Sequence, residues 1–215
     1  MQTLDYFEPF AYFFKYKSWL KKFLLASLLT YTLLGAAPIF GWMIEIVRRI
    51  GCSEKPEVPE LADWKTFWRM GGKFAYTNML WLLPLLLAVV LLYLPLILAG
   101  RLPGETLLIV WGALLACVLI FLLIYSILYA IFFPAMQVVL ARTGSGGQAA
   151  NPLRLWGTIR PHLSGYLMVY LIVGLALFNV TLAVAALTAF LLLPPLLVYA
   201  GLVTAHFAGQ LMRMD

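Results

Sequence analysis

The stretch from His162 to Met212 contains no Asp, Glu, Lys or Arg, and this constrains the fold more than any other feature of the sequence. The whole chain of 215 residues is 64% hydrophobic and only 11% charged, whereas a soluble domain carries about 25% charged residues. A water-soluble core could not enclose so much apolar surface, so the lipid bilayer must be the solvent for most of it. Unbroken Leu, Val and Ala runs exclude the alternating pattern of a β-barrel. We therefore expect an all-α integral membrane protein that crosses the bilayer several times.

Four apolar segments are long enough to cross a bilayer, which takes roughly 20 helical residues. Pro134 is expected to close the segment 106–133. Pro194 and Pro195 suit the start of the segment 194–212, because proline fits the first turn of a helix better than its middle. The turn before that helix is therefore placed near Leu187 to Pro194. The predicted spans are residues 74–98, 106–133, 163–187 and 194–212, within a single membrane domain of residues 1–215.

The first apolar segment, residues 23–47, has two interpretations. It is either a fifth span or a re-entrant hairpin bent at Gly35–Gly41, where Gly and Pro interrupt the apolar run. A span would place five basic residues on one side of the membrane and ten on the other. A hairpin places fourteen on one side and leaves Arg101 alone on the other. The hairpin fits the enrichment of Lys and Arg in cytoplasmic loops better and is favoured, although its backbone must be shielded by protein.

Basic and aromatic residues mark three segments at the membrane surface: residues 1–22, the loop 48–73 and a second loop 141–161. In the loop 48–73, Pro56 and Pro59 keep the backbone extended, and Asp63 can cap a helix that begins near Trp64. That helix is amphipathic, with rings on one face and cations on another. Its predicted interface anchors are Trp64, Phe67, Trp68, Lys65, Arg69 and Lys73. They would hold the helix at anionic headgroups; the alternative is a docking site for a partner or a lipid headgroup.

The sequence shows no arrangement of catalytic residues, and we expect the protein not to be an enzyme. Cys52 and Cys117 are the two cysteines, and no ligand spacing indicates a metal site. His162 and His206 flank the charge-free stretch, and imidazole is a good axial ligand for haem. No paired ligand spacing supports haem or pigment binding at either histidine, so no cofactor is expected.

Glu45 is the one acidic residue of the first apolar segment. Carboxylates at membrane depth are functional candidates, but Arg48 and Arg49 lie within reach on the same helix, and we expect a structural ion pair. The net charge of +6 is explained by cytoplasmic loops that face anionic lipid, so nucleic acid is not an expected partner.

Two predicted helices carry small residues four positions apart, a spacing that lets helices approach closely. Gly201, Ala205 and Gly209 form the longer face, and Gly112 with Ala116 forms the shorter one. Packing within the chain is the favoured interpretation of both faces, and contact with a partner protein is the alternative.

Several short motifs resemble one family of bacterial and archaeal membrane proteins. The motifs are Gly41-Trp42, Arg48-Arg49, Val58-Pro59-Glu60, Asp63-Trp64, Gly72, Leu83-Pro84 and the tail from Ala205 to Arg213. The family is that of domain of unknown function 4013, in which a Leu-Pro-Glu-x-x-Asp-Trp loop precedes the second apolar segment. This chain departs from the pattern at Val58, where leucine is usual, and at the paired glycines Gly71 and Gly72. The resemblance implies a multi-pass membrane architecture and no assigned chemistry.

A small apolar chain with helix-packing faces and no reactive site is expected to act through assembly. We expect a non-catalytic scaffold or accessory subunit of a membrane complex, located in the cytoplasmic (inner) membrane with its main loops in the cytoplasm. Its partners would be anionic lipid headgroups and other membrane protein subunits. The alternative is a transporter or flippase-like protein for a lipid or a small apolar solute. Ion-coupled transport is disfavoured because the spans lack charged residues.

Overall fold

The computed structural model describes residues 4–214 apart from 17, 53–57, 61–62, 94–96, 98–103 and 189, and this part of the chain forms helices without strands. Two compact units are present, Met1–Thr77 with Ile131–Asp215, and Asn78–Ala130. Within the described residues, four helical stretches are long and apolar enough to cross a membrane: Trp64–Leu91, Gly104–Thr143, Pro152–Leu187 and Leu193–Met214. The predicted membrane-protein class and its four spans are therefore confirmed, with different boundaries.

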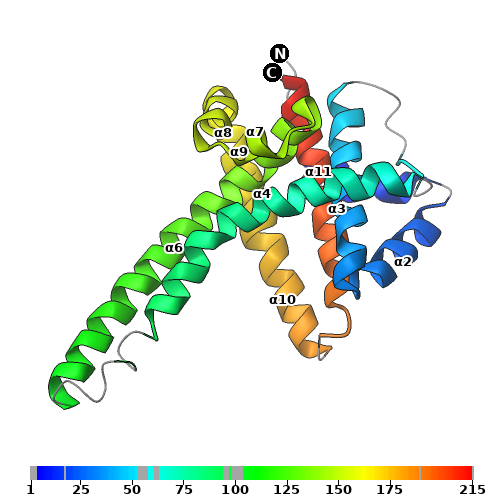
Figure 1. The fold of residues 1–215 in the computed structure, drawn as a ribbon. Helices are drawn as coiled ribbons and strands as arrows, with labels where there is room; N and C mark the ends of the chain where they lie inside the picture. The colour runs from blue at the N-terminus through cyan, green and yellow to red at the C-terminus, as the bar shows by residue number, and fades with distance from the viewer. Residues whose placement is uncertain are drawn as a thin grey trace. The chain divides into compact units, whose positions relative to one another are not determined.

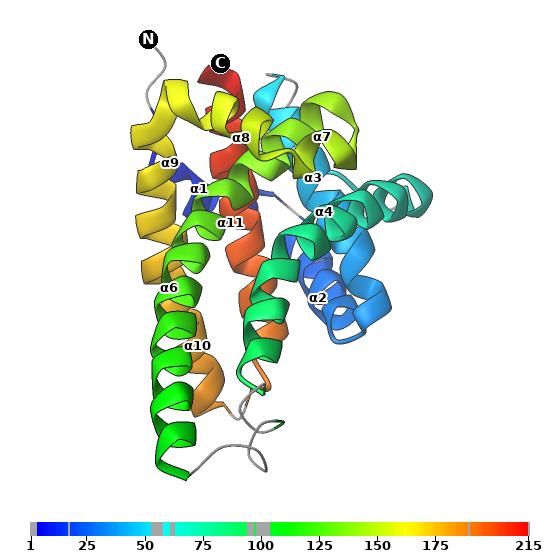
Figure 2. The same ribbon diagram turned by 60° about the vertical axis from the view of Figure 1, so that its left-hand side comes forward.

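The N-terminal segment folds back on itself (Figures 1 and 2). After α1, Glu8–Tyr12, and a 3₁₀ turn, Phe13–Lys15, come α2, Trp19–Thr30, and α3, Leu33–Gly51. We call α2 and α3 the N-terminal hairpin. Its elbow is at Tyr31–Thr32, because Thr32 is extended and its side chain accepts a hydrogen bond from the Gly35 amide at 3.0 Å, which caps α3. The predicted bend at Gly35–Gly41 is wrong: α3 continues through these residues with Pro38 inside it.

Both ends of the segment formed by α1 and the N-terminal hairpin lie beside the C-terminal end of α11, Leu193–Met214. At the start of the segment, the Asp5 amide donates to Gln210 Oε1 at 3.0 Å. At its end, the Gly51 backbone lies against the Met212 side chain. At the elbow, the Tyr31 hydroxyl donates to the carbonyl of Leu191, just before α11 begins. The segment therefore runs along α11 to the elbow and back again, so that its two ends lie near the same end of α11.

The core of the first unit lies between α3 and α11, which pack extensively against each other. The two helices run parallel, because Met43 lies against Gly201 and Ile50 lies against Gly209. Trp42, Ile46, Val47 and most residues from Leu202 to Leu211 are buried there. Small residues on α11 let α3 approach closely, so that side chains of α3 fill the space above the glycines.

Three further helices follow the long helix α6, Gly104–Thr143, in the sequence. They are α7, Gly146–Ala150, α8, Pro152–Ile159, and α9, Leu163–Val169, with a 3₁₀ turn, Arg160–His162, before α9. Asn151 caps α8 by accepting hydrogen bonds from the amides of Leu153 and Arg154, and Pro152 occupies the first helical position. The segment 141–161, predicted as a loop, is therefore mostly helical. A π-helical segment, Tyr170–Leu177, links α9 to α10, Phe178–Leu187.

Two predicted boundaries fail at positions where proline lies inside a helix. α6 continues through Pro134, which was expected to close the span. α4, Trp64–Leu91, contains Pro84 and joins the predicted surface helix to the predicted span 74–98; residues 94–96 and 98 lie outside the described residues. Proline removes one backbone hydrogen bond but is tolerated in membrane helices where neighbouring groups satisfy the freed carbonyl. The turn predicted at Leu187–Pro194 is confirmed, because α10 ends at Leu187 and α11 begins at Leu193.

The second unit, Asn78–Ala130, pairs the C-terminal part of α4 with the N-terminal part of α6 in antiparallel orientation. Two tyrosines on α6 form hydrogen bonds to α4 and hold the two helices together. The Tyr125 hydroxyl donates to the Trp81 carbonyl at 2.6 Å, and the Tyr129 hydroxyl donates to Asn78 Oδ1. Most large apolar side chains of this unit remain exposed, which is the pattern of helices solvated by lipid.

Candidate functional site

A cleft of about 680 Å³ opens between the N-terminal hairpin, residues 58–60 and the start of α4. We call it the charged cleft. Its charged lining residues are Lys22, Glu45, Arg48, Arg49, Glu60 and Asp63, and its other lining residues are Tyr16, Ser18, Val58, Pro59, Thr66 and Phe67. Three cations and three carboxylates gathered at one hollow are unusual in a chain with so few charges, so this is our candidate functional site.

An ion-pair network forms the floor of the charged cleft. Glu45 accepts two hydrogen bonds from Arg48, Nε to Oε2 at 2.9 Å and Nη2 to Oε1 at 2.8 Å, and one from Arg49 Nε at 3.1 Å. Burial alone would raise the pKa of Glu45, but the hydrogen bonds and charges of the two arginines outweigh it and hold this pKa below its ordinary value. The predicted ion pair is confirmed. It fixes both guanidinium groups at the cleft.

Residues 58–60 form one wall of the charged cleft, and two hydrogen bonds from the N-terminal hairpin hold them. Lys22 Nζ donates to the Val58 carbonyl at 2.8 Å, and Trp42 Nε1 donates to the Pro59 carbonyl at 2.9 Å. The Trp42 ring is fully buried. Proline keeps this stretch extended and leaves its carbonyls available as acceptors. The family motifs around Trp42 and Pro59, far apart in sequence, thus meet in one structural element.

The first turn of α4 completes the charged cleft and crosses α3 at very short range. Asp63 Oδ1 accepts a hydrogen bond from the Thr66 amide at 3.3 Å, which confirms the predicted cap. A Cβ atom on Gly41 would lie 1.9 Å from the Phe67 carbonyl oxygen, and one on Gly71 would lie 1.7 Å from that of Ala37. Only glycine at these two positions lets the helices cross this closely.

The predicted interface anchors separate into three groups. Trp64, Trp68, Lys65 and Arg69 are exposed, as expected for residues that face lipid headgroups or solvent. Phe67 is buried at the crossing with α3, so its ring belongs to the core and not to the membrane interface. Lys73 Nζ donates to the Gly144 carbonyl at 2.5 Å, so this ammonium fastens the end of α6. Helical spacing correctly grouped the rings, but it could not tell which of them another helix covers.

A second hollow of about 530 Å³ lies on the other side of the first turn of α4. We call it the tryptophan groove; it is lined by Leu29, Thr32, Gly35, Pro38, Trp64, Lys65 and Trp68. The structure thus brings two of the predicted anchor rings against the elbow of the N-terminal hairpin. Sequence analysis missed both hollows, and it also missed Lys22, Glu60 and Thr66 as site residues. One signal in the sequence could have indicated the charged cleft: Arg48-Arg49 and the Val58-Pro59-Glu60 motif lie close together along the chain.

The two small-residue faces differ in their surroundings. Gly201 and Gly209 lie against α3, where a Cβ atom would come within 2.4 Å of Met43 Cε and 2.6 Å of Ile50 Cβ, and Ala205 between them is buried. Ala116 is exposed, and a Cβ atom on Gly112 would meet no atom within 4 Å. The longer face therefore packs inside the chain, and the shorter one packs against none of the residues that the structure describes.

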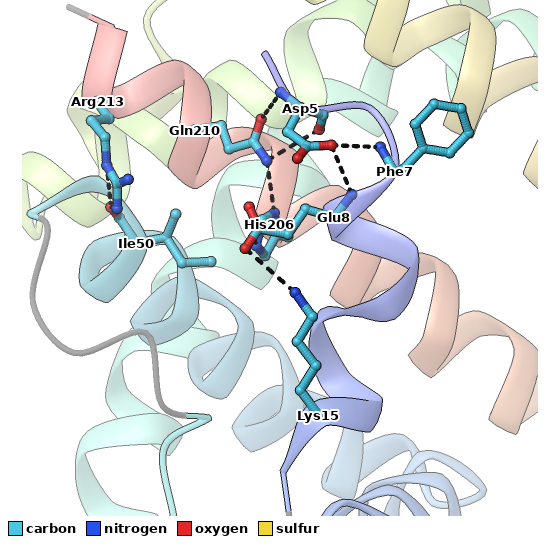
Figure 3. Close-up of polar contacts among 8 residues, drawn as sticks. All are labelled: Asp5, Phe7, Glu8, Lys15, Ile50, His206, Gln210 and Arg213. Carbon is cyan, nitrogen blue, oxygen red and sulfur yellow. Dashed lines mark hydrogen bonds and ion pairs between the residues drawn. The ribbon is translucent and has the colours of Figure 1, made fainter. Parts of the chain in front are cut away.

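Both candidate histidines lie in the first unit, in different surroundings. His206 is buried on α11, its ring centroid 4.5 Å from that of Tyr12 and its Nε2 4.0 Å from Glu8 Oε2. Gln210 Nε2 lies 3.2 Å from His206 Nδ1, and this network ties the N-terminal residues to α11 (Figure 3). His162 is half-buried at the end of the 3₁₀ turn Arg160–His162. Among the described residues, no three His, Cys, Asp or Glu side chains are grouped to hold a metal ion.

In the part of the chain that the structure describes, four long apolar helices and a hairpin folded beside the last of them define a multi-pass α-helical membrane protein. The family model described as "Protein of unknown function (DUF4013)" matches residues 24–204. The chain therefore belongs to the DUF4013 family, as its motifs indicated. No curated protein and no solved structure matches the chain.

Proposed function

We propose that this protein is a non-catalytic scaffold or accessory subunit of a membrane complex. It would lie in the cytoplasmic membrane with its main loops in the cytoplasm, and it would bind other helical membrane proteins through its apolar helices. Its basic surface would bind anionic headgroups, and nucleic acid is not among the proposed partners. If residues 23–47 form a hairpin, fourteen of the fifteen basic residues lie on one side of the membrane. Cytoplasmic loops are enriched in Lys and Arg, which supports this orientation.

The observation that carries the proposal is the contrast in burial between α6 and α11. In the most apolar part of α11, 56% of the residues are buried within the chain, whereas the corresponding figure for α6 is 6%. α6 also exposes the Gly112–Ala116 face, which is shaped for close approach of another helix. A helix that is this long and apolar and uses so little of its surface internally is suited to contact a partner in the membrane.

Purification from native membranes in lipid nanodiscs tests the proposal. We expect the protein to copurify with another helical membrane protein in a complex larger than the monomer. The Ala116→Leu variant should lose the partner because it adds bulk on the small-residue face. Cys117→Leu is the matched control: residue 117 is also exposed and lies about 100° around the helix from residue 116. A protein that is purely monomeric, or equal loss of the partner in both variants, would contradict the proposal.

A second candidate function, movement of a lipid or a small apolar solute, is supported by an apolar cavity. This cavity of about 250 Å³ lies between the N-terminal hairpin and α11, with Ile39, Met43, Val198 and Gly201 in its lining. Such a cavity can accommodate a small apolar molecule or part of an acyl chain without any charged group. A fluorescent-lipid translocation assay in proteoliposomes tests this second function. Translocation no faster than in empty liposomes would exclude lipid as the transported molecule.

A further inference from the structure

Two hollows of different character lie along the N-terminal hairpin, one lined by charged residues and one mainly apolar. The charged cleft is at Glu45, and the tryptophan groove is at Pro38 near the elbow. These two residues of α3 are about 10 Å apart along the helix axis. The start of α4 lies between the two hollows. Thr66 and Phe67 line the cleft on one face of this helix, and Trp64 and Trp68 line the groove on the other. A polar hollow next to an apolar one at this spacing matches the two ends of a lipid molecule.

The charged residues that line the cleft indicate which class of lipid headgroup it can bind. Its lining contains Lys22, Arg48 and Arg49 on one hand and Glu45, Glu60 and Asp63 on the other, so its formal charge is balanced. A site for a net anionic headgroup would show an excess of cations. The balanced set fits a headgroup that itself carries one positive and one negative charge.

The positions of the charges indicate which part of the cleft binds each charged group of the headgroup. The guanidinium groups held by Glu45 offer the planar, multiple N–H donors that bind phosphate oxygens. The exposed carboxylates of Glu60 and Asp63 lie at the loop and the first turn of α4, where they can accept hydrogen bonds from an ammonium group. A primary ammonium group donates such bonds, whereas a trimethylammonium group has no N–H to donate.

The tryptophan groove provides the matching apolar surface. The exposed indole rings of Trp64 and Trp68 face Leu29 and Pro38, and the hollow has little polar lining beyond Thr32 and Lys65. Indole rings at the membrane interface pack against the upper part of acyl chains.

We propose that this region binds one glycerophospholipid with a phosphoethanolamine headgroup. The phosphate binds at Arg48 and Arg49, the ammonium group lies between Glu60 and Asp63, and an acyl chain packs in the tryptophan groove. The bound lipid bridges the N-terminal hairpin and α4. This site does not depend on the assembly proposed above.

Native mass spectrometry of the delipidated full-length protein tests the site. The protein is mixed with equal amounts of phosphatidylethanolamine, phosphatidylcholine and phosphatidylglycerol that have identical acyl chains. We expect one phosphatidylethanolamine to be retained about tenfold more than either other lipid, the size of effect that a charge-assisted hydrogen bond supports. Equal retention of the three lipids, preference for phosphatidylglycerol, or no retained lipid would overturn the proposal.

Two variant pairs separate the headgroup contact from the acyl contact. Glu60→Gln should abolish the preference for phosphatidylethanolamine over phosphatidylcholine, while Glu105→Gln, at an exposed carboxylate on α6, should leave it intact. Trp68→Ala should weaken retention of all three lipids, and Trp156→Ala, an exposed ring on α8, should not. Identical results within either pair would overturn the part of the proposal that the pair tests.

A soluble competitor distinguishes a lipid from a free phosphate compound. Short-chain phosphatidylethanolamine should displace the retained lipid, whereas phosphoethanolamine at the same concentration should not, because it lacks the acyl chain. Equal displacement by both would exclude the tryptophan groove from the site and overturn the assignment of the ligand as a lipid.

Discussion

The backbone of Gly71 lies directly against the carbonyl group of Ala37, so close that a Cβ atom on residue 71 would come within 1.7 Å of the carbonyl oxygen. Gly41, on the partner helix, meets the Phe67 carbonyl in the same way. This double approach fixes where α4 crosses the N-terminal hairpin, and with it the position of residues that line both hollows. The neighbouring Gly72, in contrast, has open space around it.

Gly71→Ala should therefore destabilise the protein, and Gly72→Ala should not. The added methyl group at residue 71 meets backbone atoms that cannot rotate away, so we expect a loss of about 1–3 kcal/mol. At residue 72, the higher helix propensity of alanine should stabilise α4 by about 0.5–1 kcal/mol. Thermal unfolding in a mild detergent measures both variants. Equal stability of the two would show that the helices do not cross at these glycines.

The Glu45 network should make stability dependent on acidic pH. The pKa of Glu45 is lowered in the folded protein, so its contribution is fully present above the unfolded pKa, about 4.5. It is lost as the pH falls through the lower folded pKa. At pH 7, Glu45→Gln should unfold at a lower temperature than the unmodified protein, and the difference should shrink as the pH approaches 3. A difference that stays constant with pH would contradict the role of the Glu45 carboxylate charge.

Trp42→Phe should loosen residues 58–60 while preserving most of the buried ring. The substitution removes the indole N–H that the Pro59 carbonyl accepts, and an unsatisfied buried acceptor costs about 1–3 kcal/mol. Trp68→Phe, at an exposed ring, should change stability by less than about 0.5 kcal/mol. Denaturant unfolding compares the two variants. A similar effect of both substitutions would argue against the hydrogen bond as the cause.

The folded-back path of the N-terminal segment predicts that both of its ends lie on the same side of the membrane. In a Cys117→Ala background, native Cys52 and an introduced Phe7→Cys should react with a membrane-impermeant maleimide from the same side. Leu191→Cys, at the other end of α11, should react from the opposite side. All three positions are exposed in the folded chain. Labelling of residues 7 and 52 from opposite sides would show that residues 23–47 cross the membrane once.

Local rules explain the features that the sequence predicted correctly. Span lengths follow from apolar runs, the cap at Asp63 from its side chain, and the start of α11 from Pro194 and Pro195. The Glu45 ion pair joins residues three and four positions apart on one helix, which is a local relationship as well.

The features that escaped prediction depend on contacts between distant parts of the chain. Lys73 has the pattern of a headgroup anchor, but its acceptor, the Gly144 carbonyl, is 71 positions away. Phe67 has the periodicity of an exposed ring, and only the crossing with α3 buries it. The charged cleft is assembled from α2, α3, residues 58–60 and α4, and no single stretch of sequence contains enough of it to be recognised.

The pairing of α3 with α11 also determines the order in which this protein can be completed during synthesis. α3 is made early, but the surface that covers Ile46, Val47 and Ile50 is provided by the last helix of the chain. Contacts between residues as far apart as Asp5 and Gln210 form only after nearly all of the chain has left the ribosome. Until then, the N-terminal hairpin has an uncovered apolar face and backbone groups without their final packing. We expect a chain that ends before α11 to keep this face uncovered, which favours misfolding and aggregation.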